Sequence, residues 1–214
     1  MGQKINPHVV RLGNVFSWSS LWFDEKKYKE TFLEDHTLRK MLLDRLRPAG
    51  IASVEIERSI NSLKITIYVS RPGIVIGRGG SGLEELKKAI LKFLQAKKGK
   101  NSPKVDIRVE PVKEPNLNSY LVAINIADQL ARRLPHKRVL ASTAERVMSS
   151  GAKGVKIILA GRIGGAEIAR REKIHLGTVP LSTIRANISY SSFPALTKKG
   201  YIGVKVWINK KEEK

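Results

Sequence analysis

The residues best suited to do chemistry form a glycine-rich loop, Gly77-Arg78-Gly79-Gly80, which directly precedes a helical pattern. Glycine adopts positive φ easily and, lacking a side chain, lets a ligand come close to the backbone. The N-terminus of a helix presents free N–H groups and the positive end of the helix dipole, which together favour an anion. Arg78 adds a charge that can reach a phosphate. This loop therefore predicts a phosphate contact.

One possible ligand of this loop is a dinucleotide. Gly77, Gly79 and Gly82 satisfy the G-x-G-x-x-G fingerprint of such sites. The fingerprint requires a strand that leads straight into the first glycine, whereas Arg71-Pro72-Gly73 intervene here. The acidic residue expected after the second strand would be Asp106, which falls in the middle of a strand pattern. A dinucleotide is therefore the weaker alternative.

The order of the elements around the loop favours a single-stranded nucleic acid instead. From residue 24 to about residue 110 the pattern reads helix, strand, strand, short helix, glycine loop, helix, strand. This order resembles a type II KH domain, in which a GxxG loop clamps the backbone of a nucleic acid. A glycine turn without a ligand is the remaining alternative.

No set of residues predicts catalysis or a metal site. The chain has no cysteine, which excludes disulfides, a thiol nucleophile and cysteine-bound zinc. Its four histidines lack paired-ligand spacing, and the chain has neither a G-x-S-x-G elbow nor a Walker A motif. The adjacent acids Glu34-Asp35 and Glu84-Glu85 are interpreted as capping or solvated charges. We expect no catalytic residue, cofactor or small-molecule substrate, although a nuclease or a methyltransferase stays an alternative.

The charge balance predicts a polyanionic partner. Lys and Arg number 40 and Asp and Glu 19, which gives the 214-residue chain a net charge of +21 and a pI near 10.3. Such a surplus repels itself, and a nucleic acid offsets it because each neutralised phosphate releases a counterion. A membrane partner is not expected, because no apolar run approaches the ~20 residues of a span. With no signal-peptide pattern either, we expect a cytoplasmic protein.

Hydrophobic periodicity divides the chain into two α+β domains. In the first, helices are expected over residues 24–47 and from Ser81, with alternating strands near residues 54–57, 63–70 and 105–109. In the second, two helices up to residue 150 precede strands near residues 155–160, 166–175, 183–190 and 201–208. Short loops between these strands favour a mainly antiparallel four-stranded sheet. The predicted division is an N-terminal arm (1–23), a type II KH domain (24–112), a linker (113–117), a C-terminal α+β domain (118–209) and a charged tail (210–214).

Several blocks of sequence resemble one family throughout the chain. They comprise the opening residues 1–7 and 11–13, then residues 70–80, 151–156, 161–170, 179–186 and 203–208. In this order they are similar to the family of small-subunit ribosomal protein S-three of the bacterial type. The resemblance is more specific than the glycine loop alone.

The resemblance implies a structural constituent of the head of the small ribosomal subunit. It would bind small-subunit, 16S-type ribosomal RNA beside neighbouring head proteins, line the mRNA entry channel and assist mRNA unwinding. No cofactor or reaction belongs to that role. Lys137 and Arg138 match the family's mRNA-facing basic cluster, with Arg132 and Arg133 nearby, whereas Ala141 replaces a usually basic residue.

The candidate contacts to ribosomal RNA are basic residues and the glycines beside them, because both suit close approach to phosphates. A solvated face, in which Glu167 and Glu172 neutralise the arginines, is the alternative for residues near Gly164-Gly165. The aromatic residues among positions 1–22 would either contact RNA or pack onto the first domain, and Trp207 is expected to pack rather than to stack a base. The full candidate set is Gly2, Gln3, Lys4, Arg11, Arg71, Lys153, Arg162, Gly164, Gly165, Arg170, Arg171, Lys173 and Arg185.

Overall fold

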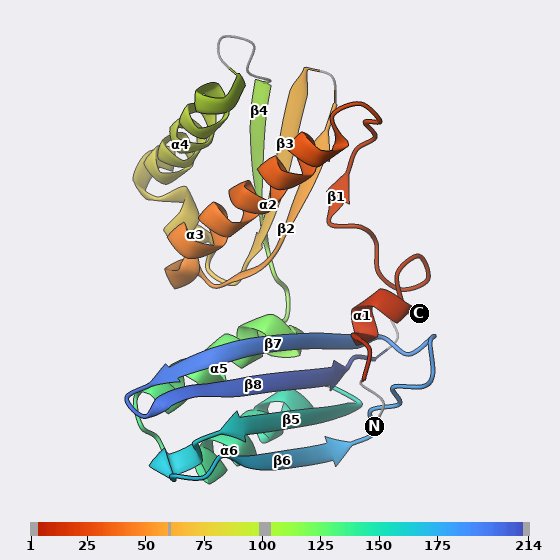
Figure 1. Cartoon of the computed structure of the whole chain (residues 1–214), viewed down its shortest axis with the longest axis vertical. Coiled ribbons are helices and arrows are strands. Elements are labelled where there is room, and N and C mark those ends of the chain that lie inside the picture. The colour runs from red at the N-terminus through yellow and green to blue at the C-terminus, as the bar shows by residue number, and fades with distance from the viewer. Residues whose placement is uncertain (1–3, 60, 99–103, 212–214) are drawn as a thin grey trace. The chain divides into compact units, whose positions relative to one another are not determined.

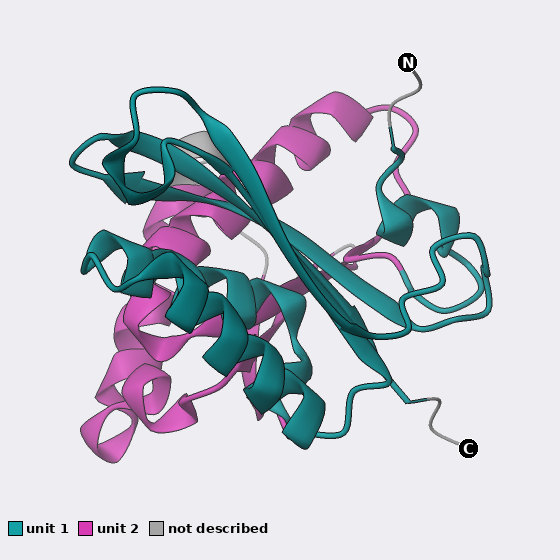
Figure 2. Cartoon of the chain, turned by 90° about the horizontal axis from the view of Figure 1, so that it is seen from below, with its two compact units in different colours: residues 1–17, 114–214 teal, residues 18–113 magenta. Residues whose placement is uncertain are grey.

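The computed structural model describes residues 4–59, 61–98 (the backbone alone for 95–98) and 104–211. The chain divides into two compact units, which Figure 2 shows in two colours. Residues 18–113 form one unit, and residues 1–17 with 114–214 form the other. Within the described ranges, no helix has the length and apolar character needed to cross a membrane.

The unit of residues 18–113 is a four-stranded mixed sheet with two long helices (Figure 1). Its strands are β1 (Ser20–Leu21), β2 (Ile51–Arg58), β3 (Ser62–Val69) and β4 (Lys104–Pro111), in the order β1-β2-β3-β4. Strands β2 and β3 are antiparallel, whereas β1 runs parallel to β2 and β4 parallel to β3. The helices are α2 (Tyr28–Arg45), the short α3 (Pro72–Ile76) and α4 (Ser81–Lys98).

Apolar periodicity explains how this unit packs. Leu63, Ile65, Ile67 and Val69 alternate along β3 and are fully buried, so the strand turns one apolar row to the core. Helices α2 and α4 bury their own apolar stripes in the same core. The predicted helix–strand–strand–helix–strand order is confirmed, and with it the KH-type architecture.

Beside this core lies a buried ion-pair cluster that the sequence had not indicated. The guanidinium of Arg58 donates to Asp35 at 2.7 Å and to Glu34 at 3.1 Å. The indole N–H of Trp22 donates to the other carboxylate oxygen of Asp35 at 2.8 Å. The interpretation of Glu34-Asp35 as capping or solvated charges was therefore wrong, since both side chains are buried and paired.

The second unit is an antiparallel sheet with two helices on one face. Its strands are β5 (Gly154–Gly161), β6 (Arg170–Gly177), β7 (Ile188–Thr197) and β8 (Gly200–Asn209), in the order β6-β5-β8-β7. All three strand pairings are antiparallel, which confirms the predicted four-stranded sheet. Helices α5 (Ser119–Ala131) and α6 (His136–Ser149) share a core with the sheet, while the short α1 (Pro7–Val10) belongs to the same unit.

Two predicted strands begin later than expected. The strand placed at residues 183–190 is β7, which starts at Ile188, because residues 179–187 follow an irregular path. Strand β6 starts at Arg170 instead of residue 166, because a turn at Ile163–Gly165 precedes it. In that turn Gly164 and Gly165 have φ of 68° and 85°, which only glycine adopts at little cost.

The segment expected to be a single arm, residues 1–23, is divided between the two units. Residues 4–17 belong with the second unit, where Phe16 stacks on His8 at 4.5 Å between ring centroids. Trp22 belongs instead to the unit of residues 18–113, through its bond to Asp35. Phe16 and Trp22 are therefore held by different units, whereas Trp18 and Phe23 are exposed.

Candidate nucleic-acid interface

The glycine loop joins helices α3 and α4 and is exposed to solvent. Helix α3 ends at Gly77, whose φ is 72° and ψ −176°, and a single 3-10 turn, Arg78–Gly80, leads into α4 at Ser81. Arg78 and Gly79 are exposed, as is Arg71, which directly precedes the first residue of α3. Arg71 and Arg78 thus lie at opposite ends of α3, and both are open to a ligand.

The glycines of this region have two different purposes. A Cβ atom on Gly82 would lie 2.5 Å from the carbonyl oxygen of Val75, so Gly82 is required where α4 passes close to α3. A Cβ on Gly79 or Gly80 would meet nothing within 4 Å, and these residues face open space. Packing thus explains the glycine that completed the dinucleotide fingerprint, and α3 separates β3 from the loop. The geometry favours the KH interpretation.

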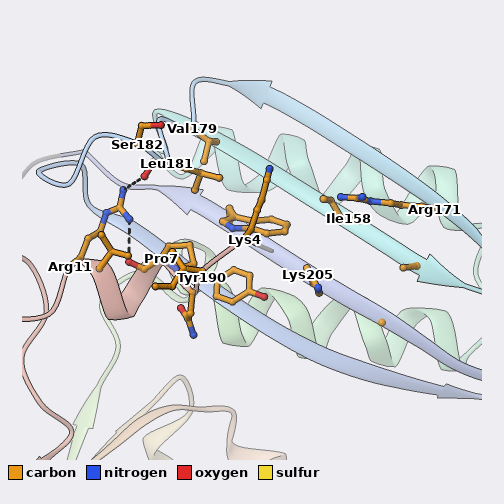
Figure 3. A pocket seen from close by; sticks show the side chains of 16 residues that line it. Lys4, Pro7, Arg11, Ile158, Arg171, Val179, Leu181, Ser182, Tyr190 and Lys205 are labelled. Carbon is orange, nitrogen blue, oxygen red and sulfur yellow. Dashed lines mark hydrogen bonds between the residues drawn. The ribbon is translucent and has the colours of Figure 1, made fainter. Parts of the chain in front are cut away.

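A second group of candidates lies on the sheet of the other unit. Strand β6 turns Ile174 towards the core shared with the helices, so Arg171 and Lys173 point to the opposite, outer face. There the register sets Lys173 across from Ile158 and Arg171 across from Ala160. Lys4, from the N-terminal segment, lines a hollow on this face together with Arg171 (Figure 3). A second hollow is lined by Lys4, Arg171 and Lys173.

Two further lysines on this outer face were missed by the sequence analysis. Lys156 is opposite Trp207 in the register and Lys205 opposite Ile158, so both share the face of Arg171. The alternation of strands β5 and β8 was visible in the sequence, but the pairing that brings these strands together was not. Burial and the charges of Lys4, Lys173 and Arg171, in that order, lower the pKa of Lys156.

Of the candidates near Gly164, Arg162 makes a hydrogen bond within the protein, whereas Arg170 is exposed. The Nε atom of Arg162 donates to the carbonyl oxygen of Ala166 at 2.9 Å, which holds the glycine turn in place. Arg170 is exposed at the start of β6, and Arg185 is exposed on the irregular segment. Lys153 is exposed between α6 and β5.

Arg11 requires a correction. It was expected to contact RNA, but its side chain is only 1% exposed. Its guanidinium donates to the carbonyl oxygens of Ala186 and Thr183, both at 2.8 Å, and of Pro7 and Leu181, both at 3.1 Å. Because its guanidinium donates to backbone carbonyl oxygens inside the protein, Arg11 has a structural role. Gly2 and Gln3 lie outside the described residues.

The basic cluster expected to face mRNA surrounds the turn between α5 and α6. Arg132, Arg133, Lys137 and Arg138 are all exposed. Arg133 has a φ of 63°, in the left-handed region that non-glycine residues seldom adopt. The Nε2 atom of His136, at the start of α6, lies 3.0 Å from Oε2 of Glu172. The turn therefore presents four cations within seven residues to solvent.

Nothing within the described ranges suggests a metal centre, since no three His, Cys, Asp or Glu side chains gather closely enough to hold an ion. An exposed GxxG loop within a helix–strand–strand–helix–strand fold, joined to a second basic unit, defines a KH-type RNA-binding protein.

Comparison with known proteins identifies the family. Residues 37–117 match the model of the KH domain, and residues 126–208 match that of the C-terminal domain of ribosomal protein S3. The small ribosomal subunit protein uS3 of Clostridium novyi is 45% identical over 213 residues, which cover 99% of this chain and 94% of that protein. The uS3 protein of Desulfitobacterium hafniense is 46% identical, with 99% and 94% covered, and that of Lactobacillus acidophilus 45%, with 99% and 92%.

The chain belongs to the family of small ribosomal subunit protein uS3. Members of this family are structural, RNA-binding components of the small ribosomal subunit in the cytoplasm and not enzymes. The family resemblance, the fold class and the structural role expected from the sequence are confirmed.

Proposed function

We propose that the chain is held in the head of the small subunit by phosphate and sugar contacts to 16S-type ribosomal RNA, beside neighbouring head proteins. The net charge of +21 supports this, because neutralised phosphates release counterions. The domains 24–112 and 118–209 both contribute contacts. In the first these come from the loop Gly77-Arg78-Gly79-Gly80 and Arg71. In the second they come from Lys153, Arg162, Gly164, Gly165, Arg170, Arg171, Lys173 and Arg185, and Lys4 of the N-terminal arm adds a further contact.

The chain also lines the mRNA entry channel and assists the unwinding of structured mRNA. The observation that carries this proposal is the exposure of Arg132, Arg133, Lys137 and Arg138 around one turn. Fixed cations beside a moving strand stabilise its separated phosphates without reading its sequence. Because Ala141 adds no charge to this turn, the contribution to unwinding is smaller than it would be with a basic residue at position 141.

The proposal is tested with ribosomes that carry Lys137→Ala with Arg138→Ala. We expect slower translation through an mRNA hairpin, unchanged speed on unstructured mRNA and normal co-sedimentation of the protein with small subunits. Lys87→Ala with Lys88→Ala is the matched control, since it removes the same charge from exposed positions on α4.

Equal slowing on both messages, or loss of the variant from small subunits, would show that the cluster serves assembly and would overturn the unwinding role. A protein that remained at the top of a sucrose gradient, away from small subunits, would overturn the structural role as well.

A further inference from the structure

The outer face of the second sheet is hollowed on the side away from α5 and α6. A cavity of about 1000 Å³ lies between this face, the N-terminal segment and the irregular residues 179–182. Figure 3 shows Lys4, Arg171, Lys205 and Tyr190 around it, with Pro7 and Leu181 at one end. A second hollow of about 360 Å³, lined by Lys4, Lys156, Ile158, Arg171 and Lys173, shares three residues with the cavity. We call the two together the outer-face groove.

Strand register makes this groove free of acidic side chains. Residues of even number on β5 and β7 and of odd number on β6 and β8 face outwards, because the inward positions form the core shared with the helices. Within these four described strands, no outward position is Asp or Glu, and Glu172 lies on the opposite face. Besides Arg11, whose guanidinium is bonded to carbonyl groups, five cations line the groove: Lys4, Lys156, Arg171, Lys173 and Lys205.

These cations repel one another, and among the described residues none has a carboxylate partner on the face they share. The pKa of Lys156 is lowered for the same reason: burial and three neighbouring cations disfavour its charged form. A bound phosphate would relieve this repulsion, because it replaces like charges at close range with opposite ones.

The floor of the groove is apolar and aromatic. Ile158 and Trp207 are 3% and 7% exposed, and the ring of Tyr190 lies 5.0 Å from that of Trp207. Tyr190 is partly exposed and lines the cavity, so part of its side chain is accessible to a ligand there. Lys156 lies over the Trp207 ring, with its Nζ atom 5.7 Å from the ring centroid. An aromatic face beside several cations is the combination that binds an unstacked nucleotide.

We propose that the outer-face groove binds an unstacked nucleotide of single-stranded RNA, with its base against Tyr190 and its flanking phosphates at Lys4, Lys156, Arg171, Lys173 and Lys205. This inference rests on the proposed binding of ribosomal RNA and names the form of RNA that this face takes. Duplex RNA fits less well, because its bases are stacked inside the helix and recognition then relies on shape.

The test uses the full chain and a fluorescein-labelled single-stranded RNA of twelve nucleotides, in a salt series read by anisotropy. Lys156→Ala with Lys173→Ala removes two phosphate contacts, so the slope of log affinity against log salt should fall by about 1.4. Lys198→Ala with Lys199→Ala is the matched control, because it removes the same charge from the exposed turn between β7 and β8. The control should weaken binding less and leave the slope within error of the wild type.

The base contact is tested separately at Tyr190. Tyr190→Leu keeps an apolar side chain but removes the π face, so single-strand affinity should fall by about fivefold or more. Tyr190→Phe should bind within twofold of the wild type, and thermal unfolding checks that each variant is folded. RNA carrying 4-thiouridine should cross-link to the peptide that contains Tyr190.

The outcomes separate this inference from the proposed function. If the wild type binds RNA but the groove pair behaves like the control pair, the groove proposal is wrong and the ribosomal RNA proposal stands. If the wild type binds no RNA in dilute salt, the proposed function itself fails. If a polyglutamate peptide binds the groove more tightly than the RNA does, in a manner that depends on Lys156 and Lys173, the site takes an acidic protein partner and our assignment is overturned.

Discussion

The Nε atom of Arg11 donates a hydrogen bond to the carbonyl oxygen of Ala186 at 2.8 Å, joining residues 175 positions apart in the chain. The same guanidinium bonds the carbonyl oxygens of Leu181 and Thr183. Residues 179–187 belong to no strand, so Arg11 supplies donors to carbonyl groups of this segment that no sheet ladder pairs. Arg11 thereby fixes the wall of the outer-face groove without taking part in it as a cation.

This arrangement predicts a large loss of stability in Arg11→Ala. The change removes a donor from the buried carbonyl groups of Ala186 and Pro7 and from the partly buried one of Leu181, and each such loss costs about 1–3 kcal/mol. We expect the free energy of unfolding to fall by at least about 3 kcal/mol, measured by urea denaturation. Arg185→Ala, which removes an exposed arginine from the same segment, should change stability by less than about 0.5 kcal/mol. A stable Arg11→Ala protein with weakened RNA binding would instead restore Arg11 as an RNA contact.

The sequence predicted those elements whose information is local. Strand β3 was found because Leu63, Ile65, Ile67 and Val69 alternate without interruption. Strand β7 was misplaced because residues 183–190 also alternate weakly, and what holds residues 183–187 out of the sheet is Arg11, far away in the chain. No local pattern reports a bond across 175 positions.

The candidate site followed the same rule. The glycine loop lies in one continuous stretch, so its residues were found together. Lys156 and Lys205 were overlooked because each is a single lysine in an alternating strand, the ordinary pattern of a solvated face. Only the pairing of β5 with β8 and β6 shows that they join Arg171 and Lys173 on one acid-free surface.

The glycine loop can be tested by reversing its charge. Gly79→Asp with Gly80→Asp should fold, because both positions have positive φ, which Asp tolerates better than most residues, and a Cβ at either meets open space. The two carboxylates would repel phosphates at the N-terminus of α4, so affinity for RNA should fall at least tenfold, or about 1.4 kcal/mol. Filter binding at low salt measures this loss.

Gly79→Asn with Gly80→Asn is the control for this change, since it has nearly the same shape and tolerance of positive φ without the charge. It should lose less than about threefold in affinity if phosphate repulsion is the cause. Equal losses in both variants would mean that the backbone of the loop, and not its electrostatics, had been damaged. No loss in either would show that this loop is unoccupied.

His8 predicts a dependence of stability on pH. Its Nε2 atom accepts a hydrogen bond from the backbone N–H of Tyr190 at 2.8 Å, which requires the neutral ring. Burial, followed by the charges of Arg11 and Lys210, lowers its pKa below the ordinary value of 6.5. As the pH falls below 6.5, the unfolded chain takes up a proton that the folded chain refuses, so stability is complete above 6.5 and falls below it.

The measurement is the melting temperature between pH 7.5 and pH 5. The wild type should lose more stability over this range than His8→Gln, whose side chain does not titrate but can still accept a hydrogen bond. The difference between the two curves isolates His8 from the other groups that titrate there. Parallel curves would show that His8 is protonated with equal ease in the folded and the unfolded chain.

Because Arg58 pairs with Glu34 and Asp35 in the interior, Arg58→Met should cost much more stability than Lys64→Met, which breaks an exposed pair. Arg58→Met keeps an apolar stem but removes the guanidinium that pairs with the buried carboxylates of Glu34 and Asp35, whose side chains are 6% and 3% exposed. Removing one partner of a buried pair costs about 3–5 kcal/mol. Lys64→Met breaks a pair of similar length, 2.9 Å to Glu57, but both side chains are over 30% exposed. That change should cost less than about 1 kcal/mol.

Urea denaturation of the two variants at pH 7 measures this difference. A near-equal, small cost in both would show that the carboxylates near Arg58 reach solvent or find other donors once the guanidinium is gone. A large cost in Arg58→Met that is relieved by adding Asp35→Asn would locate the penalty in the unpaired charge. Trp22 would still donate to the amide oxygen in that double variant, because the indole N–H needs only an acceptor. The relief would therefore come from removing charge and not from restoring a hydrogen bond.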